Sequence, residues 1–577
     1  MITASVVTPR AQTIVQRAYV YVVALVAVHM IVLGVANILR VVAELALGAP
    51  SGGFTGLPFV FAELDRPPDL YREQASLAIA LLAVGAPAWW VHFRMAERAA
   101  RTAEERASAL RSLYVHLVVF VTALLLFGYG QRALRLLLQG ISVAPPPPSP
   151  ANVAFFPLEA DWQARAAGAA GMALAAAIVL AFHARLSLGD RRAVAIRGGA
   201  ADIRHLALYA LVVVGFLFTA FSAAQTLTDV WMRVVDAFNP TTNVLVPPTP
   251  PGVTPPPRPS RDDELRFQLL GAIPAIVAGA ALWFGTWLPL QRGLVTGPDA
   301  DVERRSIVRK LAIYLIVFVT AITVLFAATA TLSLVVRRLL GDPVDASLWY
   351  GLGGPVTSLL VFVPMWIFHR RVVESEATRE SEVARAATIR RLYRYLVGAI
   401  GLGMAAFGVA GVAGVAGSAL FGLNEHSHEQ TAVYGALVLV GGAAWAFQWR
   451  TARARLDDDE RRSLPRRLYL YLAVLGGVLG LLVFGSAALY RVLNGALALS
   501  FARDTWHDVW HFAVDSAVAG AVAFWSLRAL RADRALLGAT GEETYAVTVL
   551  VRAADRDAAR ARVADALAAA PDVMLRG

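Results

Sequence analysis

The sequence predicts an all-α polytopic membrane protein of twelve transmembrane helices, arranged as six tandem helical hairpins with a small C-terminal βα tail. Three observations predict this fold class. The chain of 577 residues is 57% hydrophobic and 16% charged, with a mean hydropathy of +0.57, which is too apolar for a set of soluble domains. A short Arg- and Tyr-bearing motif recurs along the chain, and each copy opens an apolar run that a loop and a second apolar run follow.

The recurring motif is clearest at residues 466–472, Arg-Arg-Leu-Tyr-Leu-Tyr-Leu. Related versions open five earlier runs, at residues 16–22, 111–117, 204–209, 309–315 and 390–396. Six copies predict six repeats, which settles the architecture before any site is considered.

Each motif-bearing run is long enough to cross about 30 Å of hydrocarbon, which takes roughly 20 apolar residues at about 1.5 Å each. We expect these first helices at residues 18–39, 113–138, 206–228, 311–336, 395–423 and 468–490. The second helices are expected at residues 74–93, 166–182, 267–290, 348–368, 430–449 and 509–527. The first run resembles a secretory signal, but Tyr19 and Tyr21 match the later repeats, so we interpret it as a retained transmembrane helix.

These runs predict hairpin repeats with the boundaries 1–110, 111–202, 203–307, 308–388, 389–464 and 465–535. Glu and Arg alternate at helical spacing in residues 95–111 and 372–391, so the second helix of these repeats is expected to continue out of the membrane. After Arg534 the pattern changes: residues 544–552 alternate like a strand and residues 555–570 indicate an amphipathic helix. We therefore expect a cytoplasmic βα tail over residues 542–577.

The placement of basic residues predicts the orientation. The five linkers between hairpins carry 28 Arg and Lys, whereas the six loops within hairpins carry 6. Cationic side chains are retained on the cytoplasmic side, so both termini and all the linkers are expected in the cytoplasm, with the chain in a bacterial inner membrane. The net charge of +11 is then a topology signal, and no nucleic-acid partner is predicted.

Several function classes lack their sequence signatures. The chain has no cysteine, which excludes disulfides, thiolate metal sites and cysteine nucleophiles. It also has no phosphate-binding Gly-x-x-x-x-Gly-Lys-Ser/Thr loop, no Gly-x-Ser-x-Gly elbow and no His-Glu-x-x-His pair. No enzymatic activity is therefore predicted.

Two motifs together carry a family resemblance. Arg-x-Leu-Tyr-x-Tyr-Leu opens the first helices, and Trp-x-x-His lies near the end of second helices, at Trp89 to His92 and Trp366 to His369. This combination resembles an uncharacterised bacterial integral-membrane repeat family, a domain of unknown function, over roughly residues 16–531. The second and third repeats depart from it, with His116, Leu180 and Ala207 where aromatic residues are expected. The resemblance implies a topology and no activity.

The clearest candidate site is a metal site near the start of the last span. His507, His511 and Asp515 are spaced by four residues and share a helix face, and the preceding repeat carries His426 and His428 on the same side. Two helical imidazoles with a third His or a carboxylate would suit a divalent transition metal. The alternative is a cluster of His and Trp that meets lipid headgroups.

Other polar residues carry a structural and a functional interpretation. Asp515 lies about six residues into its span, where it needs a partner such as Arg491 or a role in an ion relay. His92, His183 and His369 are expected to be interfacial anchors. Arginines also recur at the ends of first helices that lead into the loops within hairpins. They either line an entrance for anions or extend their charged groups to the membrane surface.

These patterns favour a non-enzymatic scaffold or accessory subunit of a membrane complex, surrounded by lipid and bound to membrane or cytoplasmic proteins through its linkers and tail. A secondary transporter or channel is the alternative, since internal repeats are a known transporter device. Metal or redox function at the His cluster is the third hypothesis.

Overall fold

The structure is a computed structural model that describes residues 9–47, 70–142, 162–238, 261–296, 306–341, 346–379, 384–422, 427–454 and 456–539. The chain divides into two compact units, residues 1–527 and 528–577. The described part of the second unit is the end of the last helix. The predicted βα tail, residues 542–577, lies outside the described residues.

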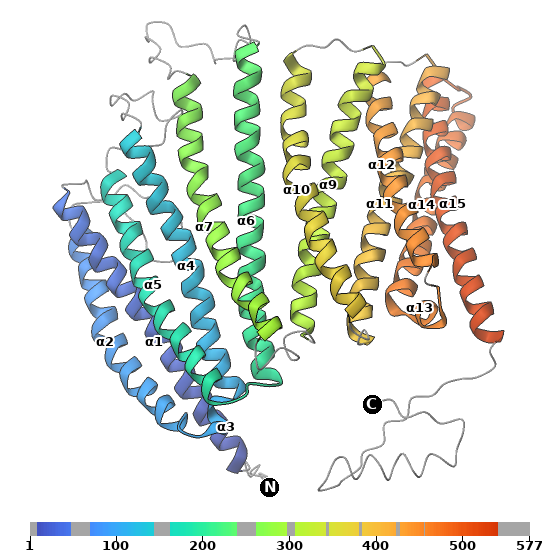
Figure 1. Cartoon of the computed structure of the whole chain (residues 1–577). Coiled ribbons are helices and arrows are strands. Elements are labelled where there is room, and N and C mark those ends of the chain that lie inside the picture. The colour runs from blue at the N-terminus through green and yellow to red at the C-terminus, as the bar shows by residue number, and fades with distance from the viewer. Residues whose placement is uncertain are drawn as a thin grey trace, which may run out of the picture. The chain divides into compact units, whose positions relative to one another are not determined.

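The described residues form 14 helices and no strand. In chain order these are α1 (Pro9–Ala46), α2 (Leu70–Ala99), α3 (Ala103–Arg106), α4 (Ala109–Ser142), α5 (Trp162–Ala193), α6 (Gly199–Phe238), α7 (Arg261–Thr296), α9 (Ile307–Leu339), α10 (Ala346–Arg379), α11 (Ala384–Leu420), α12 (Ser427–Ala454), α13 (Asp458–Arg462), α14 (Leu464–Leu497) and α15 (Arg503–Ala539). Twelve of them are long and apolar enough to cross a membrane, which confirms the predicted number of spans and an all-helical multi-pass membrane protein. Figure 1 shows the long helices running alternately up and down.

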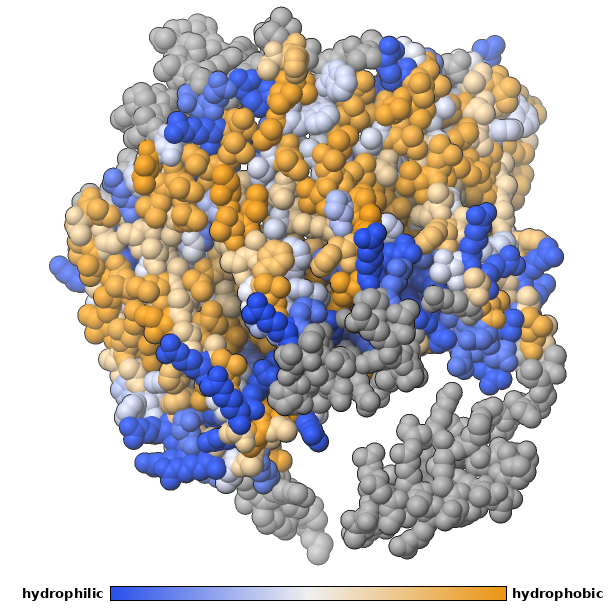
Figure 2. Space-filling view, viewed as in Figure 1, coloured by the Kyte–Doolittle hydropathy of each residue, from blue (hydrophilic) through white to orange (hydrophobic). Residues whose placement is uncertain are grey.

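Every span is longer than the apolar run that predicted it. For example, α4 extends from Ala109 to Ser142, about one turn beyond residues 113–138 at each end. Helical hydrogen bonds continue into the polar flanks because no helix-breaking residue stops them there. On the face seen in Figure 2, hydrophobic side chains cover the middle of the helices and hydrophilic ones gather towards their ends.

The expected extension of the second helix into the linker is confirmed in part. α2 continues to Ala99 and then stops, and Thr102 caps the separate short helix α3 by accepting a hydrogen bond from the Glu105 amide. In the same way Asp457 caps α13 through the Glu460 amide. Such N-caps satisfy an amide donor that has no partner in the helix. They also fix where the following glutamate lies.

The long helices assemble as three groups of four. Within each hairpin the two helices pack together, as in α1 with α2, α6 with α7 and α11 with α12. The first helix of one hairpin also packs on the second helix of the next, namely α1 on α5 and α6 on α10. α11 contacts α15 likewise, since Trp510 donates a hydrogen bond to the Ala413 carbonyl at 2.8 Å. We call these groups bundle 1 (α1, α2, α4, α5), bundle 2 (α6, α7, α9, α10) and bundle 3 (α11, α12, α14, α15).

Glycines let the paired helices approach closely. A Cβ on Gly401 of α11 would lie 2.8 Å from the Gly441 carbonyl oxygen of α12, and one on Gly441 would lie 2.6 Å from Met404. Gly215 and Gly279 meet in the same way between α6 and α7. With little hydrophobic driving force between helices in lipid, this close van der Waals packing is a main source of association.

Successive bundles meet mainly through one helix, and α10 adds a contact between bundles 2 and 3, where Trp366 donates a 3.5 Å hydrogen bond to the Tyr393 hydroxyl of α11. α4 of bundle 1 packs on α6 and α7, and α9 of bundle 2 packs on α11 and α12. Figure 1 shows α9 beside α11 and α12. We call the helix ends joined by the linkers between hairpins the linker end, and the opposite ends the loop end.

Candidate functional site

The strongest polar contacts lie at the linker end, around one buried glutamate. In bundle 3, Glu460 is buried, with 2% of the residue exposed. Its Oε1 accepts a hydrogen bond from the Tyr395 hydroxyl at 2.7 Å, and its Oε2 accepts one from Nε of Arg391 at 2.7 Å. Arg394 also lies 3.4 Å from Oε1. Glu460 thereby ties α13 to the start of α11.

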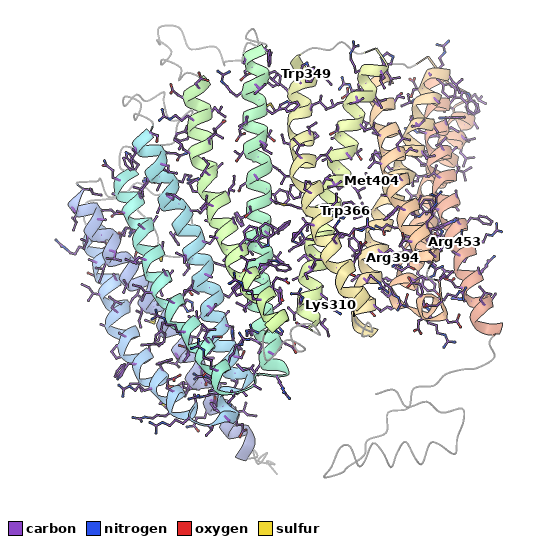
Figure 3. The ribbon with its side chains drawn as sticks, in the orientation of Figure 1. Lys310, Trp349, Trp366, Arg394, Met404 and Arg453 are labelled. Atoms are coloured by element: carbon purple, nitrogen blue, oxygen red, sulfur yellow. The ribbon has the colours of Figure 1, made fainter. Side chains whose placement is uncertain are left out.

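A second arginine completes this cluster. Arg466, near the start of α14, is 2% exposed and its Nη1 lies 3.3 Å from the Tyr395 hydroxyl oxygen. α11, α13 and α14 are therefore joined by a single set of buried polar side chains. Figure 3 places Arg394 on α11, in the half of that helix nearest the linker end.

Bundle 1 repeats the arrangement. Tyr21 donates a 2.7 Å hydrogen bond to Oε1 of Glu105, and Arg17 forms an ion pair with the same carboxylate. Arg111 takes the place of Arg466 and is also 2% exposed. Its guanidinium donates to both oxygens of Asp190 on α5, at 2.7 and 3.2 Å. It also donates to Glu97 of α2 at 2.8 Å.

Bundle 2 has the same arginine and tyrosine. Arg309 is fully buried and donates a 2.9 Å hydrogen bond to the Tyr209 hydroxyl. Its guanidinium carbon also lies 5.6 Å from the centre of the Trp287 ring. Glu303 stands six residues before Arg309, as Glu105 and Glu460 stand six before their arginines, but it lies outside the described residues.

A second layer of hydrogen bonds lies deeper in the bundles. Trp89 donates to the Tyr114 hydroxyl at 3.3 Å, and Trp445 donates to the Tyr469 hydroxyl at 3.2 Å. The Tyr114 oxygen is also 3.0 Å from Nε2 of His183. Since Nδ1 of His183 lies 2.9 Å from the Val179 carbonyl oxygen and must donate to it, Nε2 is the acceptor and Tyr114 the donor.

Burial corrects one expectation for the histidines. His183 is 1% exposed and His369 is fully buried among Phe216 and Trp283, so neither is an anchor at the lipid boundary, and that prediction was wrong for both. They lie inside their bundles because the aromatic and hydroxyl groups of neighbouring helices surround them. His92 is half-buried and contacts Tyr19, with 3.3 Å from Nε2 to the hydroxyl oxygen.

The predicted metal-site residues come together in part. His507 and His511 lie on α15 with their Nε2 atoms 3.0 Å apart, and Ser418 of α11 is 2.8 Å from Nε2 of His507. Gly414 of α11 makes room for His511, because a Cβ there would lie 2.5 Å from the imidazole. This pair sits at the contact between the first and last helices of bundle 3.

Of the other three predicted ligands, Asp515 interacts electrostatically with His511. Asp515 lies one turn further along α15, His428 begins the apolar part of α12, and His426 is outside the described residues. In the part of the chain that the structure describes, no group of three or more His, Asp or Glu side chains could hold a metal ion. The metal site therefore stays a prediction. Arg491 pairs with Asp508, at 3.0 Å, rather than with Asp515.

Comparison with protein families decides what the repeats are. A family described as a domain of unknown function (DUF5671) matches residues 17–156, 252–350 and 391–527, more than half of the chain. The chain belongs to this family. No curated protein and no solved structure matches it. The third DUF5671 match begins at Arg391 and takes in all four bundle 3 helices up to Leu527, and the repeated matches fit a repeated helical-hairpin unit.

Reasoning from the sequence missed the buried glutamates. From the sequence, the arginines of the DUF5671 repeats are interpreted as a signal of membrane orientation. Arg111, Arg309 and Arg466 are in fact buried and have partners. A usable signal was present, since a Glu and a Ser stand six and three residues before each of these arginines. Buried charges are costly unless paired, so the recurrence of an acid beside a recurring base indicates an ion pair.

Proposed function

We propose that this multi-pass membrane protein is a non-enzymatic scaffold or accessory subunit of a membrane complex, in a bacterial cytoplasmic membrane with both termini in the cytoplasm. One observation supports the proposal most. The buried arginines at the linker end are each held by partners of the same bundle, as Arg111 is by Asp190 and Glu97. Such side chains fix helices to one another and are not open to a substrate.

The location of these contacts supports a role in presenting the linkers. Glu460 and Glu105 hold the short helices α13 and α3 against the bundle, so the linkers have a defined surface. Charged residues on that surface, such as Arg98 and Glu104, are exposed. A partner protein would meet these charges at fixed positions.

Native mass spectrometry of the protein extracted in a mild detergent tests the proposal. We expect an additional protein mass in fixed stoichiometry, which is lost when Arg98 and Arg101 are both changed to Glu. The matched control changes Asp262 and Asp263 to Arg at the loop end, and should keep the partner. A chain that carries no other protein in several detergents would overturn the scaffold proposal.

Transport is the alternative that Asp515 keeps open, because this carboxyl lies within a candidate span. It predicts solute or proton flux in reconstituted vesicles that Asp515→Asn abolishes. Asp504→Asn, at the exposed start of the same helix, is the control. Unchanged flux in Asp515→Asn would remove that residue from the transport hypothesis.

A further inference from the structure

Among the residues that the structure describes, bundle 3 lacks a junction that bundles 1 and 2 both make. The second hairpin of each of those bundles begins with a helix, α4 or α9, that packs on the first hairpin of the next bundle. In the most apolar stretch of these helices 56% and 44% of residues are buried. α14 occupies the equivalent position in bundle 3, and 6% of its stretch is buried.

The junctions are equivalent at the loop end. Gln139 and Arg337 each stand 28 residues after the arginine that opens their helix. Gln139 donates a 3.0 Å hydrogen bond to the Phe267 carbonyl of α7, and Arg337 lies 3.3 Å from Glu429 of α12. The residue 28 after Arg466 is Asn494 of α14, and it is exposed.

The residues that Gln139 and Arg337 contact on the next bundle also occupy equivalent positions. Glu429 stands 16 residues before Trp445, and Phe267, whose carbonyl accepts the hydrogen bond from Gln139, stands 16 before Trp283, the tryptophan equivalent to Trp445 in the packing of the hairpin glycines. The residue 16 before Trp89 is Glu73, which is exposed on α2. An asparagine amide is a donor and a carboxylate is an acceptor, so Asn494 and Glu73 are complementary.

A second pair lies at the linker end. Tyr314 stands five residues after Arg309, and its ring centre is 5.7 Å from that of Tyr393 on α11. The residue five after Arg466 is Tyr471, and the α1 residue equivalent to Tyr393 is Tyr19, two before Tyr21. Tyr471 is 47% exposed and Tyr19 is 58% exposed.

We propose that α14 of one copy of this chain docks on α1 and α2 of a second copy, bringing Tyr471 to Tyr19 and Asn494 to Glu73. Lipid would cover the apolar part of α14 equally well. It does not account for a matched donor–acceptor pair in the register of both internal junctions, together with a matched aromatic pair in the register of the α9–α11 junction. The contact is heterologous, so it closes a ring or continues as a row of copies. It is independent of any partner bound at the linkers.

Cross-linking in membranes tests the contact, because the chain has no cysteine of its own. Tyr19→Cys and Tyr471→Cys are placed on two co-expressed copies, one substitution on each, and treated with a short thiol-to-thiol cross-linker. We expect a covalent dimer of the two copies. Each variant expressed alone should give no covalent dimer, because a heterologous contact brings different residues together and its two cysteines do not meet. Tyr314→Cys with Tyr393→Cys in one chain is the positive control and should cross-link within that chain.

A mismatched control and a second matched pair complete the test. Leu188→Cys, on the exposed face of α5 near the linker end, replaces Tyr19→Cys as the mismatched control and should reduce the dimer at least tenfold. A Glu73→Cys and Asn494→Cys pair checks the loop end independently. No dimer from either matched pair, while the positive control cross-links, would overturn the proposal. Equal yields from the matched and mismatched pairs would overturn it as well.

Discussion

Tyr395 of α11 donates a 2.7 Å hydrogen bond to Glu460 of α13, and Tyr21 of α1 makes the same 2.7 Å bond to Glu105 just before α4. The two contacts lie in different bundles, more than 350 residues apart in the sequence. Each glutamate also pairs with an arginine one turn before its tyrosine, Arg391 or Arg17. The repeat is therefore conserved within the chain as a buried ionic contact, not as a hydropathy pattern alone.

Glu460→Gln should lower the stability of the protein strongly. The substitution leaves Arg391 and Arg394 beside a neutral amide, and breaking a buried ion pair costs about 3–5 kcal/mol. The midpoint of thermal unfolding in detergent, followed by fluorescence-detected size exclusion, measures the loss. Glu429→Gln is the control, because its pair with Arg337 is partly exposed and such pairs contribute about 0–1 kcal/mol. Equal midpoints for the two variants would contradict the interpretation of Glu460 as a buried tie.

Much of the fold follows from the sequence, because the bilayer fixes the length and polarity of each span. The hairpins and the number of spans were predictable from apolar runs such as residues 113–138. The pairing of α1 with α5 was not, since the lipid-facing and protein-facing sides of a membrane helix are both apolar. The burial of Arg111 was not predictable either. An arginine near the end of a membrane helix is expected both where it reaches the lipid–water boundary and where it forms a buried ion pair.

Only part of the arrangement predicted for the metal site is found in the described residues. His507 and His511 share a helix face as their spacing requires, and they do meet. The contact with Ser418 of α11 could not be predicted from the sequence. Glycines of α11 allow α15 to approach closely, but their spacing does not indicate which helix packs against them.

Arg111→Lys should destabilise bundle 1 although the charge is kept. Arg111 donates to both oxygens of Asp190 and to Glu97, and a lysine cannot reproduce this planar fork. We expect a loss of about 1–3 kcal/mol, the penalty for leaving buried acceptors without donors. The thermal midpoint is again the measurement. Arg98→Lys, an exposed position on α2, should not shift it, and a stable Arg111→Lys protein would show that the fork is dispensable.

Gly414→Ala should loosen the contact of α11 with α15. A Cβ at this position would lie 2.5 Å from the His511 imidazole, so the ring or the helix has to move. Overpacking of this kind costs about 1–3 kcal/mol. Gly403→Ala in the same helix is the matched control, because a Cβ there meets nothing within 4 Å and Ala favours a helix. A cysteine pair at Ser418 and His507 would report the separation directly, by a lower disulfide yield in the Gly414→Ala background. An unchanged yield and midpoint would contradict the close packing.

The orientation can be checked with single cysteines, because the natural chain has none. Arg101 lies between α2 and α3 at the linker end, and Leu499 lies between α14 and α15 at the loop end, 93% exposed. The basic linkers predict that a membrane-impermeant thiol reagent labels Leu499→Cys in intact cells and labels Arg101→Cys only after permeabilisation. Both variants leave the buried contacts untouched, so their expression should match that of the natural chain. Labelling of Arg101→Cys but not Leu499→Cys from outside would invert the orientation, and the arginines of the linkers would then need a different explanation.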